Sequence, residues 1–355
     1  MNFLRFLLLV LFSFPALAAE PKDISAELEV LRAKHQVPAC ASAVIAQGRI
    51  VAFGATGFRR IDRNVRVTAD DLWHIGSCTK SMTAALVGML VDEGQLRWET
   101  TIAEALPDTP AHAGWKQVTV WHLVTQRSGI APMTRDQWRT LDTGPGSARE
   151  QRATLARRLL AQSPVEPPGK FAYSNSGYGL LGAIIERASG ETYEDMLRTR
   201  IFQLKTAGFG APATPGKIDQ PWGHRQGDNI TPVEPLPENQ FPLVLAPGGC
   251  VHMSLQDFAR FAWWLSSNQP PLVKEQTFAH LQTPPEGSAY AGGLWQTVLP
   301  GVGGAAVSHT GRMGGFSAVF HAARDRACVT VFTIGDGGWE WLGEEIASTA
   351  LQAAP

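Results

Sequence analysis

Residues 76–90 of this chain read Gly-Ser-Cys-Thr-Lys-Ser-Met-Thr-Ala-Ala-Leu-Val-Gly-Met-Leu and have the spacing of a buried helix. Apolar side chains recur there at positions i, i+3, i+4, i+7 and i+8, namely Met82, Ala85, Leu86, Met89 and Leu90. This periodicity predicts one apolar helix face, and Gly94 is a suitable residue to end the helix. Ser77 and Lys80 stand three residues apart at its start, so both project from one side of the helix.

The pair Ser77 and Lys80 has the residue types of an activated nucleophile. A serine hydroxyl attacks a carbonyl poorly until a neighbouring base takes its proton, and burial of a lysine lowers its pKa toward that role. The N-terminus of the helix adds free N–H groups and positive potential where an oxyanion would form. A helix-capping serine followed by a solvated lysine is the structural alternative.

The segments on either side of this helix predict strands at both ends of the chain. Ile24, Leu28 and Leu31 have helical spacing, and residues 41–46 and 50–53 then flank a Gln-Gly-Arg turn, which indicates a helix followed by a β-hairpin. Residues 305–309, 316–320 and 328–334 predict further strands, with a charged turn at 324–326 and a helix from about Trp339. In the middle of the chain, apolar residues recur mostly with helical spacing, and loops rich in proline and glycine separate these segments.

We therefore expect an α+β fold in which the N- and C-terminal segments form one antiparallel sheet flanked by helices, with a mostly helical subdomain inserted into it. The expected division is a single domain over residues 20–355, with a sheet part at about 20–75 and 290–355 and a helical part at about 76–289. A catalytic cleft would lie between the two parts.

Two more motifs follow Ser77 and Lys80 in a fixed order: Tyr173-Ser174-Asn175 and His309-Thr310-Gly311. Each is common alone, but the ordered set resembles the serine hydrolase family of class C β-lactamases, D-alanyl-D-alanine carboxypeptidases, D-aminopeptidases and related esterases. The resemblance covers most of the chain and includes Pro247-Gly248-Gly249 and Gly314-Gly315-Phe316-Ser317. It implies a β-lactamase/transpeptidase-like fold.

The resemblance also implies catalytic roles. Ser77 would form the acyl intermediate, and Lys80 and Tyr173 would share the general-base work as a coupled pair. Asn175 would hold the amide group of the substrate and help to fix Lys80. Tyr173 is one of only four tyrosines, although a loop tyrosine packed on a proline-rich turn is the structural alternative.

On the other wall of the cleft, the resemblance implies that the strand carrying His309, Thr310 and Gly311 binds the substrate. The backbone N–H groups of Ser77 and Arg312 would form the oxyanion hole, where one donor is typically worth about 2.7–4 kcal/mol in the transition state. The Arg312 side chain, at the cleft rim, would either engage a substrate carboxylate or stay solvated. A satisfied strand histidine is the structural alternative for His309.

The chain departs from the family pattern at two places. His309 stands where many β-lactamases of the family have lysine, and this resemblance favours carboxypeptidase and esterase members. Residues 125–129 read Thr-Gln-Arg-Ser-Gly in place of the usual His-Thr-Ser-Gly, and we expect this position to be the structural end of a helix. The six residues from Gly177 to Gly182 match a dinucleotide fingerprint, but no βαβ pattern surrounds them, so we expect them to begin a helix.

Residues 1–19 have the pattern of a secretory signal peptide. Arg5 precedes a short apolar run that ends in Ala16-Leu17-Ala18-Ala19, and the run is shorter than the roughly 20 apolar residues that span a bilayer. We therefore expect export to the periplasm or medium without a stable membrane anchor. Export makes the four cysteines candidates for disulfides, while four buried thiols are the alternative; they are Cys40, Cys78, Cys250 and Cys328.

Composition excludes other classes of function. The chain has 355 residues, 44% hydrophobic residues and a net charge of −1, which indicates a globular protein and gives no basic stripe for nucleic acid. No zinc-binding spacing occurs, so we expect no metal and no organic cofactor. The sequence predicts an enzyme that acts on a small-molecule or peptide amide or ester, of the D-amino-acid peptidase, carboxypeptidase or esterase type. A class C-like β-lactamase, or a penicillin-binding or sensor protein without turnover, are the alternatives, and no oligomeric state is predicted.

Overall fold

The computed structural model describes residues 20–141, 143–201, 206–335 and 338–355, and the predicted leader over residues 1–19 lies outside them. A seven-stranded sheet dominates this part of the chain, in the order β1-β3-β2-β12-β11-β10-β9. All neighbours pair antiparallel except β1 and β3. The strands are β1 (Lys22–Asp23), β2 (Ala39–Ala46), β3 (Arg49–Gly57), β9 (Trp295–Val298), β10 (Ala305–Met313), β11 (Phe316–Ala323) and β12 (Arg326–Phe332).

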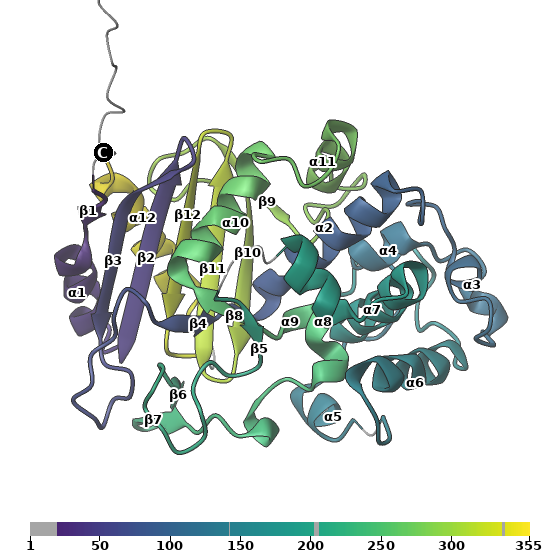
Figure 1. Ribbon diagram of the computed structural model, residues 1–355, viewed down its shortest axis with the longest axis horizontal. Coiled ribbons are helices and arrows are strands. Elements are labelled where there is room, and N and C mark those ends of the chain that lie inside the picture. Colours follow the sequence, from purple (N-terminus) through teal and green to yellow (C-terminus); the bar gives the residue numbers. More distant parts are fainter. Residues whose placement is uncertain (1–19, 142, 202–205, 336–337) are drawn as a thin grey trace, which may run out of the picture.

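The two ends of the chain close this sheet. β2 and β3 form the predicted hairpin, with Gln47 and Gly48 at φ of 50° and 75° in its turn, as a two-residue turn of this type requires. β12 then pairs with β2, so that Val329 lies opposite Ala43. The predicted α+β architecture, with a sheet built from both termini, is confirmed (Figure 1).

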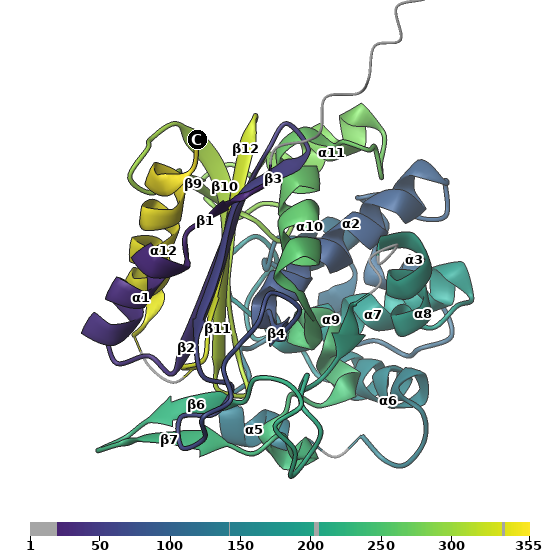
Figure 2. The same cartoon turned by 60° about the vertical axis from the view of Figure 1, so that its left-hand side comes forward.

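Helices cover both faces of the sheet (Figure 2). α1 (Ser25–Lys34) and α12 (Glu340–Ala353), both predicted, lie on one face, and α10 (Leu255–Ser267) lies on the other. Alternation along β2 supplies both layers: Cys40 and Val44 pack with α1 and α12, whereas Ala41 and Ala43 pack on the side of α10. Burial on both faces explains why β2 is apolar except for Ser42, whose hydroxyl donates to the Val329 carbonyl over 2.9 Å.

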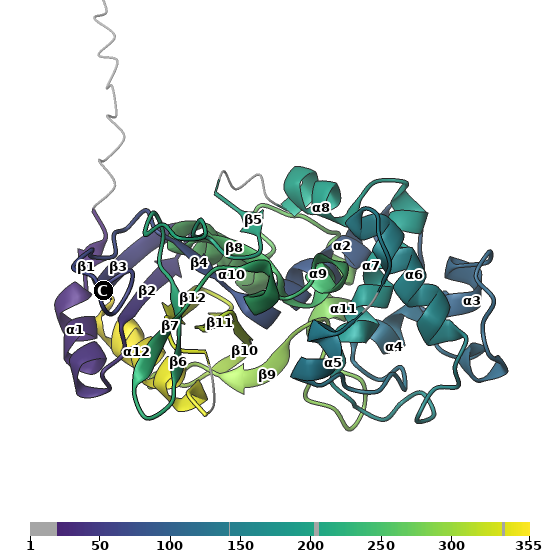
Figure 3. The ribbon, with the colours of Figure 1, turned by 90° about the horizontal axis from the view of Figure 1, so that it is seen from below.

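The inserted helical part lies beside the sheet, against the face that carries α10 (Figure 3). α2 (Thr79–Asp92) is its central helix, and residues Thr79 to Leu90 are all buried, so the helix is covered on every side and not only on the apolar face that its periodicity predicts. The other helices of this part are α3 (Ile102–Ala105), α4 (Val120–Val124), α5 (Arg135–Arg139), α6 (Ala148–Leu160), α7 (Asn175–Ser189), α8 (Tyr193–Met196), α9 (Ala246–Gly249) and α11 (Glu275–Gln282).

Short strands and one-turn helices connect these elements. The single-turn elements are η1 (Gly76–Cys78), η2 (Ala113–Trp115), η3 (Leu197–Ile201), η4 (Pro237–Asn239) and η5 (Leu243–Leu245). A three-stranded sheet joins β4 (Leu72–His74), β8 (Val251–Ser254) and β5 (Gly208–Phe209), and β6 (Gly223–Gln226) pairs with β7 (Ile230–Val233). The pairing of β4 with β8 matters for the site because it places residues 246–250 beside the start of α2.

A reciprocal cap and a buried arginine paired with two glutamates fix the helical part. Ser147 begins α6 with a capping box to Glu150. Within the helices, Arg152 of α6 is fully buried and lies 2.6 Å from Glu186 of α7 and 2.7 Å from Glu194 of α8. A buried arginine of this kind requires both hydrogen-bond partners and opposite charge, and Arg152 has both.

All four cysteines are buried, unpaired thiols in the structure. Burial raises the pKa of Cys40 and Cys328 to about 12 and that of Cys78 and Cys250 further still. Of the two expectations for the cysteines, the structure bears out the buried thiols. Among the described helices, none combines the length and the apolar character needed to cross a membrane.

Candidate active site

Ser77 lies on η1, the single turn that leads into α2, and its side chain is partly exposed. Gly76 before it has a φ of 50°, a conformation that favours glycine, and its N–H donates to Nδ1 of His74 over 3.0 Å. The hydroxyl of Thr79 donates to the carbonyl of Gly76 over 2.7 Å. These contacts hold the turn so that Ser77 projects from the N-terminal end of a buried helix.

Lys80 lies directly beside this serine and is fully buried. Its Nζ atom is 3.2 Å from Oγ of Ser77, 2.7 Å from Oδ1 of Asn175 and 2.5 Å from the carbonyl oxygen of Gly248. The two carbonyl-type oxygens can only accept hydrogen bonds, so each takes one N–H of Lys80. Ser77 is the partner that can also donate, and a neutral Lys80 therefore turns its lone pair toward the Ser77 hydroxyl.

Electrostatics favour this neutral form. Burial holds the pKa of Lys80 well below its ordinary value because the charged ammonium loses its hydration. Nζ also lies 4.6 Å from the ring centroid of Tyr173 and 5.3 Å from that of Tyr178, so both phenols pack around the amine. An unprotonated amine beside a serine hydroxyl is a competent general base.

Tyr173 completes the group around Ser77 from the loop before α7. Burial of its phenol raises its pKa, while its hydrogen bond with Ser77 acts in the opposite direction. Tyr173 is therefore better suited to hold and donate a proton than to be the phenolate base. The structure brings Ser77, Lys80, Tyr173 and Asn175 together, from an η1–α2 segment and an α7 segment about a hundred residues apart.

The departure at residues 125–129 lies where a helix ends, as expected: α4 ends at Val124. Gln126 follows with a φ of 60°, and its side-chain oxygen accepts from the N–H of Ser174 over 2.9 Å. Its carbonyl accepts from the N–H of Ala172 over 2.8 Å. The segment thus supports the loop that carries Tyr173, and α7 begins at Asn175 with the glycines of residues 177–182 inside it.

β10 carries the third motif, and strand alternation divides its side chains between two faces. His309 is buried and faces the aromatic rings of the site: its ring centroid is 6.3 Å from that of Tyr173. Thr310 and Arg312 lie on the other face, toward α12, where Arg312 pairs with Glu340 at 3.0 Å. The structure thus brings the His309 side chain to the site and turns the Thr310 side chain toward α12, while Arg312, paired with Glu340, borders the hollow beside Ser77.

The backbone of β10 nevertheless lies against Ser77. A Cβ atom on Gly311 would be 2.7 Å from the backbone nitrogen of Ser77, and one on Gly76 would be 2.5 Å from that of Arg312. Glycine at both positions therefore permits a close approach of the two backbones. The N–H groups of Ser77 and Arg312, the pair expected to form an oxyanion hole, belong to neighbouring segments.

A hollow of about 220 Å³ opens beside Ser77. Its lining combines backbone from glycine-rich segments with two aromatic side chains, Trp138 and Phe241, whose ring centroids are 5.4 Å apart. Asn175, Gly248 and Arg312 also contribute to its wall. The hollow thus offers polar backbone near the nucleophile and an apolar wall farther out.

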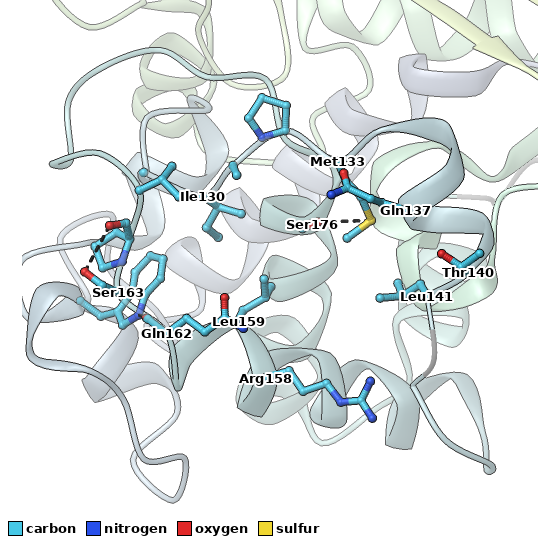
Figure 4. A pocket seen from close by; sticks show the side chains of 16 residues that line it. Ile130, Met133, Gln137, Thr140, Leu141, Arg158, Leu159, Gln162, Ser163 and Ser176 are labelled. Carbon is cyan, nitrogen blue, oxygen red and sulfur yellow. Dashed lines mark hydrogen bonds between the residues drawn. The ribbon is translucent and has the colours of Figure 1, made fainter.

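A larger cavity, of about 510 Å³, lies among α5, α6 and the start of α7 (Figure 4). Ser176 reaches it and contacts the sulfur of Met133 at 4.0 Å. No lysine or histidine is among its lining residues, so no serine there has a base beside it. The smaller hollow at Ser77 is the candidate active site. Within the described residues, no group of three or more histidine, cysteine, aspartate or glutamate side chains could hold a metal ion.

The sequence reasoning missed several contributors to the site, among them Trp138 and Phe241 of the hollow. Gly248 was noted only as part of a motif, His74 was not considered, and Tyr290, whose hydroxyl lies 3.2 Å from Nε2 of His309, was not considered either. Tyr290 is one of four tyrosines and precedes two glycines, which is the only local signal that it carried.

Comparison with known proteins bears on this geometry. The family model described as Beta-lactamase matches residues 24–353, which is nearly the whole described chain. The chain belongs to the beta-lactamase family of serine hydrolases. The resemblance inferred from the ordered motifs is thereby confirmed.

Two curated relatives illustrate the range of this family. Penicillin-binding protein 4 of Amycolatopsis lactamdurans is 33% identical over 244 residues, which cover 66% of this chain and 61% of the relative. A beta-lactamase of Escherichia coli (strain K12) is 27% identical over 255 residues, covering 69% of this chain and 60% of the relative. The chain thus matches about three fifths of the length of these relatives.

Solved structures share the fold over almost the whole chain. The octameric penicillin-binding protein homologue from Pyrococcus abyssi has a TM-score of 0.74 at 21% identity and covers 94% of this chain and 77% of its own. D-amino acid amidase from Ochrobactrum anthropi SV3, complexed with L-phenylalanine, has a TM-score of 0.73 at 20% identity. The match covers 93% of this chain and 97% of the amidase chain. These likenesses establish the same architecture.

Proposed function

We propose that this protein is an exported serine hydrolase that cleaves an amide or ester bond through an acyl–Ser77 intermediate. The observation that carries the proposal is the 3.2 Å contact between Nζ of Lys80 and Oγ of Ser77 in a buried, neutralising environment. Substrates are expected to be peptides or amides of D-amino acids, with small esters as the alternative. Export rests on the pattern of residues 1–19, and the N-terminal sequence of protein recovered from the periplasm or medium tests it.

The first half of the reaction follows from the contacts of Lys80. Oγ of Ser77 attacks the substrate carbonyl carbon while Nζ of Lys80 takes its proton, and the N–H groups of Ser77 and Arg312 stabilise the oxyanion. The leaving amine or alkoxide must receive a proton, which the phenol of Tyr173 is suited to supply because its raised pKa keeps it protonated. Tyr173 then recovers a proton from Lys80, and water releases the acyl group in the second half.

The exposed edge of β10 favours an extended, amide-containing substrate. β9 pairs with β10 only from Ala305 to Ser308, so within the described residues no strand covers that edge beyond Ser308. Backbone N–H and C=O groups on such an edge bind an extended chain by β-strand addition. This edge runs directly past Ser77, so a bound amide would present its carbonyl to the nucleophile.

The apolar wall of the hollow favours a substrate with an apolar side chain, since Trp138 and Phe241 are both buried there. Structural neighbours include a D-amino acid amidase and a D-stereospecific amidohydrolase from Streptomyces sp., which supports D-configured amides as the first class to try. His309, in place of the lysine of many β-lactamases, weighs against the β-lactamase alternative.

The test is mass spectrometry of the intact protein after exposure to a fluorophosphonate and to a fluorescent penicillin. We expect one adduct that maps to Ser77 and is lost in Ser77→Ala, whereas Ser163→Ala, a change in an exposed loop, keeps it. Absence of any adduct on folded protein would overturn the enzyme assignment.

Substrate class is separated by hydrolysis assays. The substrates to compare are D-phenylalanine amide, D-Ala-D-Ala peptides, p-nitrophenyl esters and nitrocefin. For the amide and the peptides, the L-enantiomers are measured as well. Faster turnover of the D-amides supports the proposal, and faster turnover of the esters supports the esterase alternative. Rapid nitrocefin hydrolysis would instead support a β-lactamase, and a stable adduct without turnover would support a penicillin-binding or sensor protein.

A further inference from the structure

Tyr290 is a fully buried tyrosine on the loop between α11 and β9. Its hydroxyl lies 3.2 Å from Nε2 of His309, and the other ring nitrogen, Nδ1, lies 2.5 Å from the carbonyl oxygen of Thr310. A carbonyl oxygen only accepts, so Nδ1 carries the proton. Nε2 of the neutral imidazole is then an acceptor, and the O–H of Tyr290 donates to it. The Tyr290 oxygen also has hydrogen-bond contacts with Tyr178 and Gln126.

The loop that carries Tyr290 is seated on the catalytic helix. Gly293 has a φ of 70°, and a Cβ atom there would lie 2.8 Å from the carbonyl of Lys80. The ring of Tyr290 packs edge-on against Trp295 of β9, with centroids 4.8 Å apart, and edge-on toward Tyr173 at 6.5 Å. The phenol therefore has a fixed position relative to both Lys80 and β10.

His309 faces several polar groups from the elements around it. They are Lys80 of α2, Tyr173 before α7 and Tyr290, and the thiol of Cys78 on η1 donates to the His309 carbonyl over 3.2 Å. A protonated His309 would place a second positive charge beside Lys80. Burial and Lys80 both oppose it and lower the pKa of His309 to about 3.

We propose that Tyr290 is a positioning residue that holds His309 as the neutral imidazole with its proton on Nδ1 and thereby fixes the start of the free β10 edge. His309 is the last residue before this edge passes Ser77, so its ring orientation sets the path of Gly311 and of the Arg312 N–H. Tyr290 acts through His309 and does not contact the reacting atoms. The expected effect of Tyr290 on acylation rests on the proposed acyl–Ser77 chemistry, whereas the assignment of the His309 tautomer does not.

The test combines nitrogen NMR of histidine-labelled protein with single-turnover kinetics. His309 is assigned by the loss of its signals in His309→Asn. We expect the wild-type protein to show a protonated Nδ1 and a hydrogen-bonded, unprotonated Nε2. In Tyr290→Phe we expect the Nε2 resonance to shift as its hydrogen bond is lost, and acylation of Ser77 by an amide substrate to slow about 10-fold.

Tyr193→Phe is the matched control. Tyr193 is equally buried, and its hydroxyl forms a hydrogen bond of 2.7 Å with Oγ1 of Thr83, a residue of α2. Its ring does not contact His309. This variant should keep the His309 signals and the acylation rate. Equal slowing in the two variants, or an unshifted Nε2 resonance in Tyr290→Phe, would overturn the proposal.

The wild-type spectrum provides a test if Tyr290→Phe fails to fold, because a proton on Nε2 of His309 is incompatible with the proposal. Failure of the proposed function gives a different result. In that case Ser77 acquires no adduct in the wild-type protein, while the histidine spectrum still reports the tautomer of His309.

Discussion

Nζ of Lys80 lies 2.7 Å from Oδ1 of Asn175, so the helix that carries the nucleophile is joined to the first residue of α7. This contact and that with the Gly248 carbonyl orient the lysine so that its remaining direction faces Ser77. Orientation by two fixed acceptors gives the amine a single direction in which it can accept a proton. The base is thus defined by three segments that are distant along the chain.

Removal of the Asn175 contact should slow acylation and also lower the stability of the fold. Asn175→Ala leaves one N–H of buried Lys80 unpaired, and loss of a hydrogen bond at a potentially charged group costs about 1.5–3 kcal/mol, or about 10- to 100-fold in rate. Rapid-quench measurement of acyl–Ser77 formation checks this. Asn229→Ala, in an exposed turn, is the control, and equal rates in the two variants would contradict the role of Asn175.

The pH dependence should report the lowered pKa of Lys80. Only the unprotonated amine accepts the Ser77 proton, so acylation rises with pH through the Lys80 pKa and levels off well below pH 10.5, the ordinary lysine value. The acylation rate of the intact protein between pH 5 and 10 measures this limb. Lys80→Arg should lose the limb because arginine stays protonated. A midpoint near 10.5 in the wild-type protein would refute a neutral Lys80.

Any side chain at position 311 should displace the β10 backbone from Ser77. In Gly311→Ala the new Cβ would lie 2.0 Å from the carbonyl oxygen of Ile75 and 2.7 Å from the nitrogen of Ser77. Overpacking of this kind costs about 1–3 kcal/mol, so we expect a lower melting temperature and at least a 100-fold loss of acylation. Gly227→Ala, where the nearest atom is 3.7 Å away, should change neither quantity. If Gly311→Ala were acylated at the wild-type rate, the oxyanion site would have to lie elsewhere.

Buried neutral histidines should make the protein sensitive to mild acid. Burial lowers the pKa of His74 and His309 to about 3 and that of His224 to about 4, whereas unfolded histidine titrates near 6.5. The unfolded state therefore binds more protons below pH 6.5, and stability falls as pH decreases. Each histidine contributes a slope of up to about 1.4 kcal/mol per pH unit, and urea unfolding at pH 7, 6 and 5 measures the sum.

His224→Asn should reduce this slope by the contribution of one histidine, and this reduction is expected whether or not the change alters the free energy of unfolding at pH 7. Asn229→Ala, a non-titrating change at an exposed position, is the control and should leave the slope unchanged. A free energy of unfolding that stays constant between pH 7 and 5 would be the contrary result.

Local signals predicted much of the architecture. The i, i+3, i+4 spacing of residues 76–90, the Gln-Gly turn of the hairpin and the strands at both ends of the chain all depend on neighbours within a few residues, and the structure has each of them. The ordered motifs also predicted the family. The division into a sheet part and a helical part stays a prediction, and α10, within residues 76–289, packs on the sheet.

By itself, the sequence determined that Ser77 and Lys80 share a helix face, because helical periodicity is a local property of the chain. The resemblance carried by the ordered motifs also implied that His309, Thr310 and Gly311 lie on one strand, whose side chains alternate between two faces. Only the tertiary structure decided which of these two faces meets Ser77, and that Gly248 and Tyr290 complete the site. Those choices depend on which distant segments pack together, and the packing of non-local backbones has no periodic signature in any one segment.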